Sequence, residues 1–92
     1  MKHLNIKIYG QVQGVFFRVS AKEKAEELNI AGFVRNEPDG PVYVEAEGEK
    51  ESLDEFLQWC KNGPEGAKVD KVEVAEGSLK NFSEFKRDFA DY

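Results

Sequence analysis

The residues best suited to chemistry lie in a loop near the N-terminus, between a predicted strand and a predicted helix. Residues 10–18 read GQVQGVFFR, with glycines at 10 and 14 and Arg18 at the start of the helix. Glycines let backbone N–H groups converge on one point, and the first turn of a helix offers further donors and a positive dipole end. The planar guanidinium of Arg18 can bind two phosphate oxygens together. The combination indicates an anion site, although a plain strand-to-helix connector is the commoner explanation of such a loop.

A second polar residue, Asn36, ends the apolar run of another predicted strand, residues 32–36. A strand–helix–strand crossover brings the C-terminal ends of both strands to one edge of the sheet, roughly 10 Å apart if a third strand lies between them. The Asn36 amide can therefore face an anion held by the loop, and it can orient a water molecule by donating and accepting hydrogen bonds. Alternatively, Asn36 only opens the turn of residues 37–40, EPDG, where asparagine is common.

The elements that must position these residues follow from the hydrophobic periodicity. Alternation of apolar and polar residues predicts four strands, at residues 4–8, 32–36, 42–46 and 69–74. The first of these strands is expected to stop at Gly10. Helical spacing predicts two helices, at residues 18–29 and 52–62. Phe85, Arg87 and Phe89 stand at strand spacing, so residues 82–89 can add a fifth, edge strand. The order βαββαβ is typical of an α+β ferredoxin-like sandwich, with two helices on one face of an antiparallel sheet.

Size and charge narrow the classes of function. A chain of 92 residues with 40% apolar residues is predicted to form one domain over residues 1–92. The net charge of −5 argues against a nucleic-acid partner. We expect no membrane partner, because the sequence contains neither a signal-like segment nor a span-length apolar run. With a single cysteine, the expected location is the cytoplasm. A monomer is expected by default, because nothing in the sequence demands pairing through an exposed sheet edge.

The remaining candidate groups are predicted to be structural. One histidine and one cysteine offer no His/Cys metal cluster and no Cys–His pair within one motif, so neither a metal nor another cofactor is expected. His3 is expected at the surface, at the edge of the first strand. Cys60 stands on an apolar helix face and is expected in the core.

Two segments carry a resemblance to a known family. Residues 10–18 resemble the acylphosphatase signature G-x-V-Q-G-V-x-F-R at every specified position. Residues 32–42, GFVRNEPDGPV, are similar to the second signature of that family, G-x-V-x-N-x-x-D-G-x-V. The resemblance runs from Leu4 through the fourth predicted strand and weakens after Ala75.

The resemblance implies a ferredoxin-like fold and hydrolysis of acyl phosphates to carboxylate and phosphate without a metal. The phosphate-binding arginine of the family falls on Arg18, and its water-orienting asparagine falls on Asn36. Its phosphate cradle falls on Gln13, Gly14, Val15, Phe16, Phe17 and Arg18. The partners implied are a small-molecule acyl phosphate and the phosphate anion, with 1,3-bisphosphoglycerate, carbamoyl phosphate and acetyl phosphate as candidate substrates.

Two other interpretations stay open at this point. The chain can be a non-catalytic ferredoxin-like module that binds phosphate or another ligand, because this architecture hosts many functions. It also resembles the acylphosphatase-like domain at the front of hydrogenase-maturation carbamoyltransferases, in which the pocket handles carbamoyl phosphate within a larger enzyme.

Overall fold

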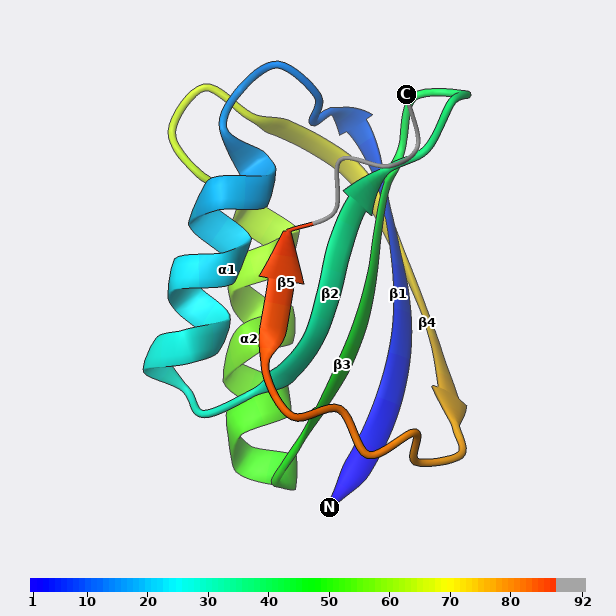
Figure 1. Cartoon of the computed structure of the whole chain (residues 1–92). Helices are drawn as coiled ribbons and strands as arrows, with labels where there is room; N and C mark the ends of the chain where they lie inside the picture. Colours follow the sequence, from blue (N-terminus) through cyan, green and yellow to red (C-terminus); the bar gives the residue numbers. More distant parts are fainter. Residues whose placement is uncertain (88–92) are drawn as a thin grey trace.

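A five-stranded sheet with two helices on one face forms the structure (Figure 1), a computed structural model that describes residues 1–87. The strands are β1 (Lys2–Gln11), β2 (Ala31–Asn36), β3 (Val42–Gly48), β4 (Lys68–Gly77) and β5 (Phe85–Arg87). The helices are α1 (Phe17–Glu27) and α2 (Lys50–Asn62). The predicted ferredoxin-like sandwich is confirmed, including the fifth strand.

The strand order across the sheet is β4-β1-β3-β2-β5, so β3 lies between β1 and β2, the arrangement on which the expected distance between Asn36 and the loop depends. The first four strands pair antiparallel, whereas β5 pairs parallel to β2. The predicted antiparallel pairing is confirmed for the first four strands, whereas the sequence left the pairing of the fifth, edge strand open. Residues 78–84 carry the chain from β4 at one edge to β5 at the other, around the end of the sheet where β1 begins (Figure 1). Because β5 starts at that end, it runs in the direction of β2. The predicted strand residue Phe89 lies outside the described residues.

Gly10 lies within β1 and does not end it as predicted. The pairing register between β1 and β4 shifts between Tyr9 and Gly10, which marks a bulge. Gly10 has a φ of 133°, and a Cβ atom there would stand 2.1 Å from the carbonyl oxygen of Lys68. Only glycine permits this close approach, which lets β1 continue to Gln11 before the chain enters the loop.

The core lies between the sheet and the helices. Strand residues Ile6, Ile8, Val34 and Val44 are fully buried, and α1 contributes Ala21 and Ala25. The buried face of α2 consists of Leu53, Phe56 and Cys60. The predicted core position of Cys60 is confirmed, and burial raises the pKa of its thiol above its ordinary value. Among residues 1–87, no helix is long and apolar enough to span a membrane.

The opposite face of the sheet is partly covered, and the expectation that His3 lies at the surface was wrong. His3 is 1% exposed, and its ring stacks on Phe82 with the centroids 5.9 Å apart. Its Nδ1 lies 2.7 Å from Glu47 Oε2, and its Nε2 lies 2.9 Å from Asn5 Oδ1. Glu47 also accepts hydrogen bonds from the backbone N–H groups of Lys80 and Phe82. These contacts fasten residues 80–82 onto the sheet and so fix the chain that leads into β5.

Candidate active site

The loop between β1 and α1 has an unusual backbone. Gly14 has a φ of 75°, and Phe16, which immediately precedes α1, has a φ of 63°. A bulky residue in this left-handed region is strained, and strain of this kind concentrates at functional sites. The Phe16 side chain is 80% exposed, so core packing does not explain its conformation. The loop is therefore held in a particular shape with its large apolar side chain at the surface.

This backbone leads directly into an open helix start. Among the described residues, no side chain caps α1 by a hydrogen bond, and the first turn contains Arg18 and no carboxylate. The Ser20 N–H donates to the Phe16 carbonyl at 3.1 Å and so begins the helical ladder. The N–H groups before it point out of the helix toward the loop, at the positive end of the helix dipole. An anion placed there is favoured by these donors and by the Arg18 guanidinium together.

Asn36 reaches the same place from the end of β2. Its side chain is directed to the helix-facing side of the sheet and is 8% exposed, in register with Val42 of β3. The predicted turn follows at once, and the Gly40 N–H donates to the Glu37 carbonyl at 3.1 Å. This turn restrains the backbone immediately after Asn36 and so places the residue at the rim of the sheet.

Gln13 ties the loop to this turn. Its Nε2 donates to the carbonyl oxygens of Glu37, at 2.8 Å, and Pro41, at 3.1 Å. Sequence reasoning placed Gln13 only in a backbone cradle and missed this bridge. Because one amide joins both segments, the distance between the loop and Asn36 is set by a side-chain contact as well as by the sheet.

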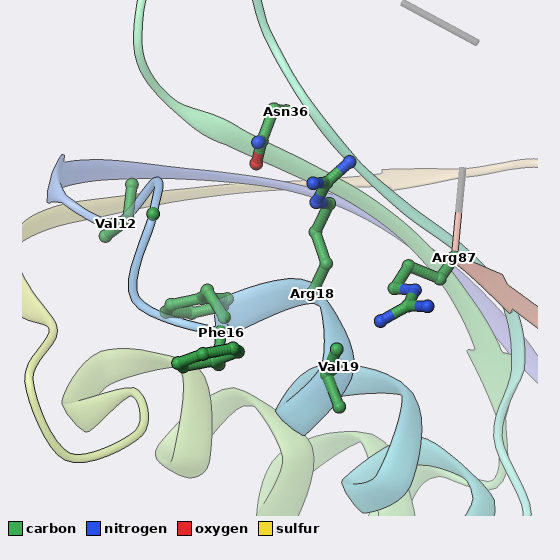
Figure 2. Close-up of a pocket in the computed structure, with 8 residues that line it drawn as sticks. Val12, Phe16, Arg18, Val19, Asn36 and Arg87 are labelled. Atoms are coloured by element: carbon green, nitrogen blue, oxygen red, sulfur yellow. The ribbon is translucent and has the colours of Figure 1, made fainter. Parts of the chain in front are cut away.

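One pocket of about 310 Å³ collects the predicted site residues. Figure 2 shows Arg18 from α1, Asn36 from β2 and Arg87 from β5 around it, with Phe16 at the loop. The residues that line it are Val12, Gly14, Phe16, Phe17, Arg18, Val19, Asn36 and Arg87. Gln13 and Val15, which the family resemblance implied for the phosphate cradle, are not among the lining residues. Arg87 was not predicted there, because its position depends on the strand that β5 pairs with.

The chemistry of this lining suits a small anion with an apolar part. Within residues 1–87 the wall offers two guanidinium groups, one amide and no carboxylate, beside the apolar side chains of Val12, Phe16 and Val19. Guanidinium groups and a helix start are groups that bind anions, so the net charge of −5 is no obstacle to a small anion at this wall. The described part of the chain also contains no group of three or more His, Cys, Asp or Glu side chains placed to hold a metal ion.

Comparison with known proteins agrees with this geometry. A family model described as Acylphosphatase matches residues 4–89. An acylphosphatase of Methylococcus capsulatus is 46% identical over 86 residues, covering 92% of this chain and 94% of that protein. The crystal structure of acylphosphatase from Bacillus subtilis is 36% identical, with a TM-score of 0.94 over 97% of this chain and 100% of the other.

A third similarity concerns a larger protein. A full-length HypF structure in a phosphate- and nucleotide-bound form is 30% identical, with a TM-score of 0.84 over 94% of this chain. The match covers only 11% of HypF, whereas the acylphosphatases of M. capsulatus and B. subtilis match over nearly their whole length. The two signature segments, the fold and these matches lead to one conclusion: the chain belongs to the acylphosphatase family.

Proposed function

We propose that this acylphosphatase cleaves acyl phosphates with Arg18 and the loop amides holding the phosphoryl group and Asn36 orienting the attacking water. The observation that carries these roles is the shared pocket, in which an uncapped helix start, a guanidinium and a buried amide meet from α1 and β2. We also infer a single domain for residues 1–92, which the one core between sheet and helices supports. The cytoplasmic location and the monomeric state stay predictions from the sequence.

The reaction needs little chemical assistance from side chains. The water oxygen forms a bond to phosphorus while the bond between phosphorus and the bridging oxygen breaks, and the electron pair leaves with the carboxylate. Because a carboxylate is a good leaving group, catalysis consists mainly of positioning and of stabilising charge on the phosphoryl oxygens. The proton released by the water passes to a phosphoryl oxygen, since an amide is not a base near neutral pH.

The two principal residues have separable tasks. Arg18 and the first-turn N–H groups bind the phosphoryl oxygens in the ground state and more strongly as charge develops. Asn36 acts on the water, so its amide matters for the rate and hardly for the affinity of phosphate. Gln13 supports both by holding the turn after Asn36 against the loop.

This division is testable by measuring kcat with benzoyl phosphate and the inhibition constant of inorganic phosphate on the same variants. Asn36→Ala is expected to lower kcat by about 10²-fold while the phosphate inhibition constant changes little. Asn62→Ala, which removes an exposed amide at the end of α2, is the matched control. Loss of phosphate binding in Asn36→Ala would refute the role given to Asn36. Phosphate binding by wild-type protein without turnover would favour the non-catalytic module.

A further inference from the structure

Arg87 enters the pocket from an element that the two signature segments do not include. In the parallel pairing of β2 and β5, Gly32 stands beside Phe85 and Val34 beside Arg87. Phe85 is 2% exposed and packs on Phe56, with the ring centroids 6.1 Å apart, so its side chain faces the helices. Side chains alternate along a strand, which places Arg87 on that same face and Lys86 on the other. Arg87 therefore shares a face with Val34 and Asn36.

The register also gives the direction of approach. Asn36 lies two residues beyond Val34 along β2, and Arg87 lies beside Val34 on the neighbouring strand. The two side chains are thus diagonal neighbours on one face of the sheet, within reach of one small ligand. Arg18 approaches from α1 (Figure 2). The two guanidinium groups therefore come from different elements, and Figure 2 shows Arg87 beside Arg18.

The phosphoryl group does not account for both arginines. In the proposed mechanism its oxygens are held by Arg18, the loop amides and the start of α1, all from one continuous segment. Arg87 comes from β5, outside that segment, and Figure 2 shows it on the side of Arg18 away from Val12 and Phe16, so it is left to contact the acyl part. A guanidinium forks onto two oxygens of a carboxylate or phosphate, so a half-buried arginine there selects a second anionic group. The volume of about 310 Å³ limits the acyl part to a compact one.

We propose that Arg87 is a specificity-determining residue that binds an anionic group on the acyl part, so that the preferred substrates are compact acyl phosphates bearing a further carboxylate or phosphate. The inference rests on the proposed function, because it assigns the other half of the same substrate. Arg87, which lies outside both signature segments, thus binds the acyl part of the substrate. Arg18 and Asn36 act at the phosphoryl group, where the bond is cleaved.

The test compares substrates that differ by one carboxylate. Benzoyl phosphate is the reference, and 3-carboxybenzoyl and 4-carboxybenzoyl phosphate place the added charge at two distances from the phosphate. For each protein the quantity measured is the ratio of kcat/KM for the carboxylated substrate to kcat/KM for benzoyl phosphate. This ratio is independent of the fraction of active enzyme, so partial misfolding of a variant does not affect it. The intrinsic reactivity of each substrate also cancels between variants.

The expected result is that Arg87→Gln lowers the ratio about tenfold for at least one carboxylated substrate, equivalent to about 1.4 kcal/mol. Arg87→Lys keeps the charge but not the planar fork, so it is expected to retain part of the preference. Lys86→Gln is the matched control, because it removes the same charge from the adjacent residue on the opposite, exposed side of β5. Its ratio is expected to equal that of the wild type.

Three outcomes would overturn the inference. An unchanged ratio in Arg87→Gln would mean that Arg87 does not contact the acyl part. An equal loss of kcat/KM for every substrate would place Arg87 on the phosphoryl group or in the support of the pocket. The same decrease of the ratio in Lys86→Gln would mean that the preference for carboxylated substrates comes from the overall charge of the protein and not from a contact with Arg87. Failure of the wild type to hydrolyse any of these substrates would instead refute the proposed function, so the two failures are distinguishable.

Discussion

Glu47 is the buried carboxylate whose removal has the most predictable consequence. It is 2% exposed, contacts the His3 ring, and accepts the backbone N–H groups of Lys80 and Phe82. In Glu47→Gln the side chain keeps one oxygen that can accept a hydrogen bond. Its NH₂ group replaces the other oxygen and faces a group that itself donates. The change therefore loses a charge-assisted hydrogen bond, about 1.5–3 kcal/mol, and leaves a buried N–H without an acceptor, about 1–3 kcal/mol. We expect the free energy of unfolding to fall by about 3 kcal/mol.

The same carboxylate predicts how stability depends on pH. Burial by itself raises the pKa of Glu47, but the Lys80 N–H, the His3 side chain and the Phe82 N–H outweigh burial and bring the pKa below 4.5. Between the lowered pKa of the folded state and the ordinary pKa of 4.5 in the unfolded state, the unfolded chain binds more protons than the folded chain. Stability therefore rises with pH across this window. The contribution is fully present above pH 4.5 and is lost as the pH falls through the folded-state pKa. Glu45, whose pKa is lowered by hydrogen bonds from Lys80 and Tyr43 despite burial, adds to the effect.

Urea unfolding at pH 7 and at pH 3 measures both effects. For a domain of 92 residues, a loss of about 3 kcal/mol is a large part of a total of about 5–14 kcal/mol. The variant is expected to show a smaller difference between the two pH values than the wild type does. Glu76→Gln is the control, because its exposed ion pair with Lys2 at 3.1 Å contributes little. Equal midpoints for Glu47→Gln and Glu76→Gln at pH 7 would refute the reasoning.

Three further predictions concern the loop and the core. Gln13→Ala removes the hydrogen bonds to the Glu37 and Pro41 carbonyls, so kcat with benzoyl phosphate is expected to fall about tenfold, with the exposed Gln11→Ala as control. Phe16→Gly relieves the left-handed backbone and is expected to raise the free energy of unfolding by up to about 1 kcal/mol in urea titrations, while KM rises because an apolar wall is lost. The thiol of Cys60, fully buried and with a raised pKa, is expected to react with a disulfide reagent at pH 8 only after unfolding; fast reaction of the native protein would contradict its place in the core.

Most of the fold was predictable because local periodicity determined it. The apolar face of α2 could be identified from residues spaced three, four and seven apart, and Leu53, Phe56 and Cys60 are buried in the structure. The same reasoning failed for His3. Its position in β1 puts it on the face away from the helices, where a polar residue usually meets water. Its cover comes from Phe82 and neighbouring residues, far along the chain, and no periodicity in the first strand reports that contact.

Some residues of the candidate site were likewise predicted from the sequence, and others were not. Arg18 and Asn36 were proposed on the family resemblance, because their positions at element ends alone favoured a plain connector and a turn residue; the crossover connection brings those ends to one edge of the sheet. Arg87 could not be identified, because β5 has only three residues and its parallel pairing with β2 depends on where residues 78–84 lead the chain. The bridge from Gln13 was equally hidden, since its acceptors are two backbone carbonyls that the sequence does not mark.

Arg18 is predicted to stabilise the phosphoryl group in a reaction that needs no metal. The most direct test follows the loss of benzoyl phosphate absorbance with wild-type protein and Arg18→Ala, each with and without EDTA. Arg35→Ala is the control, because Arg35 lies on β2 with its guanidinium 4.9 Å from the Tyr43 ring centroid, outside the pocket lining. We expect wild-type hydrolysis that chelation leaves unchanged and, among the two variants, a loss of at least about 10²–10³-fold in Arg18→Ala only. A rate that survives in Arg18→Ala, or that chelation abolishes in the wild type, would contradict this prediction.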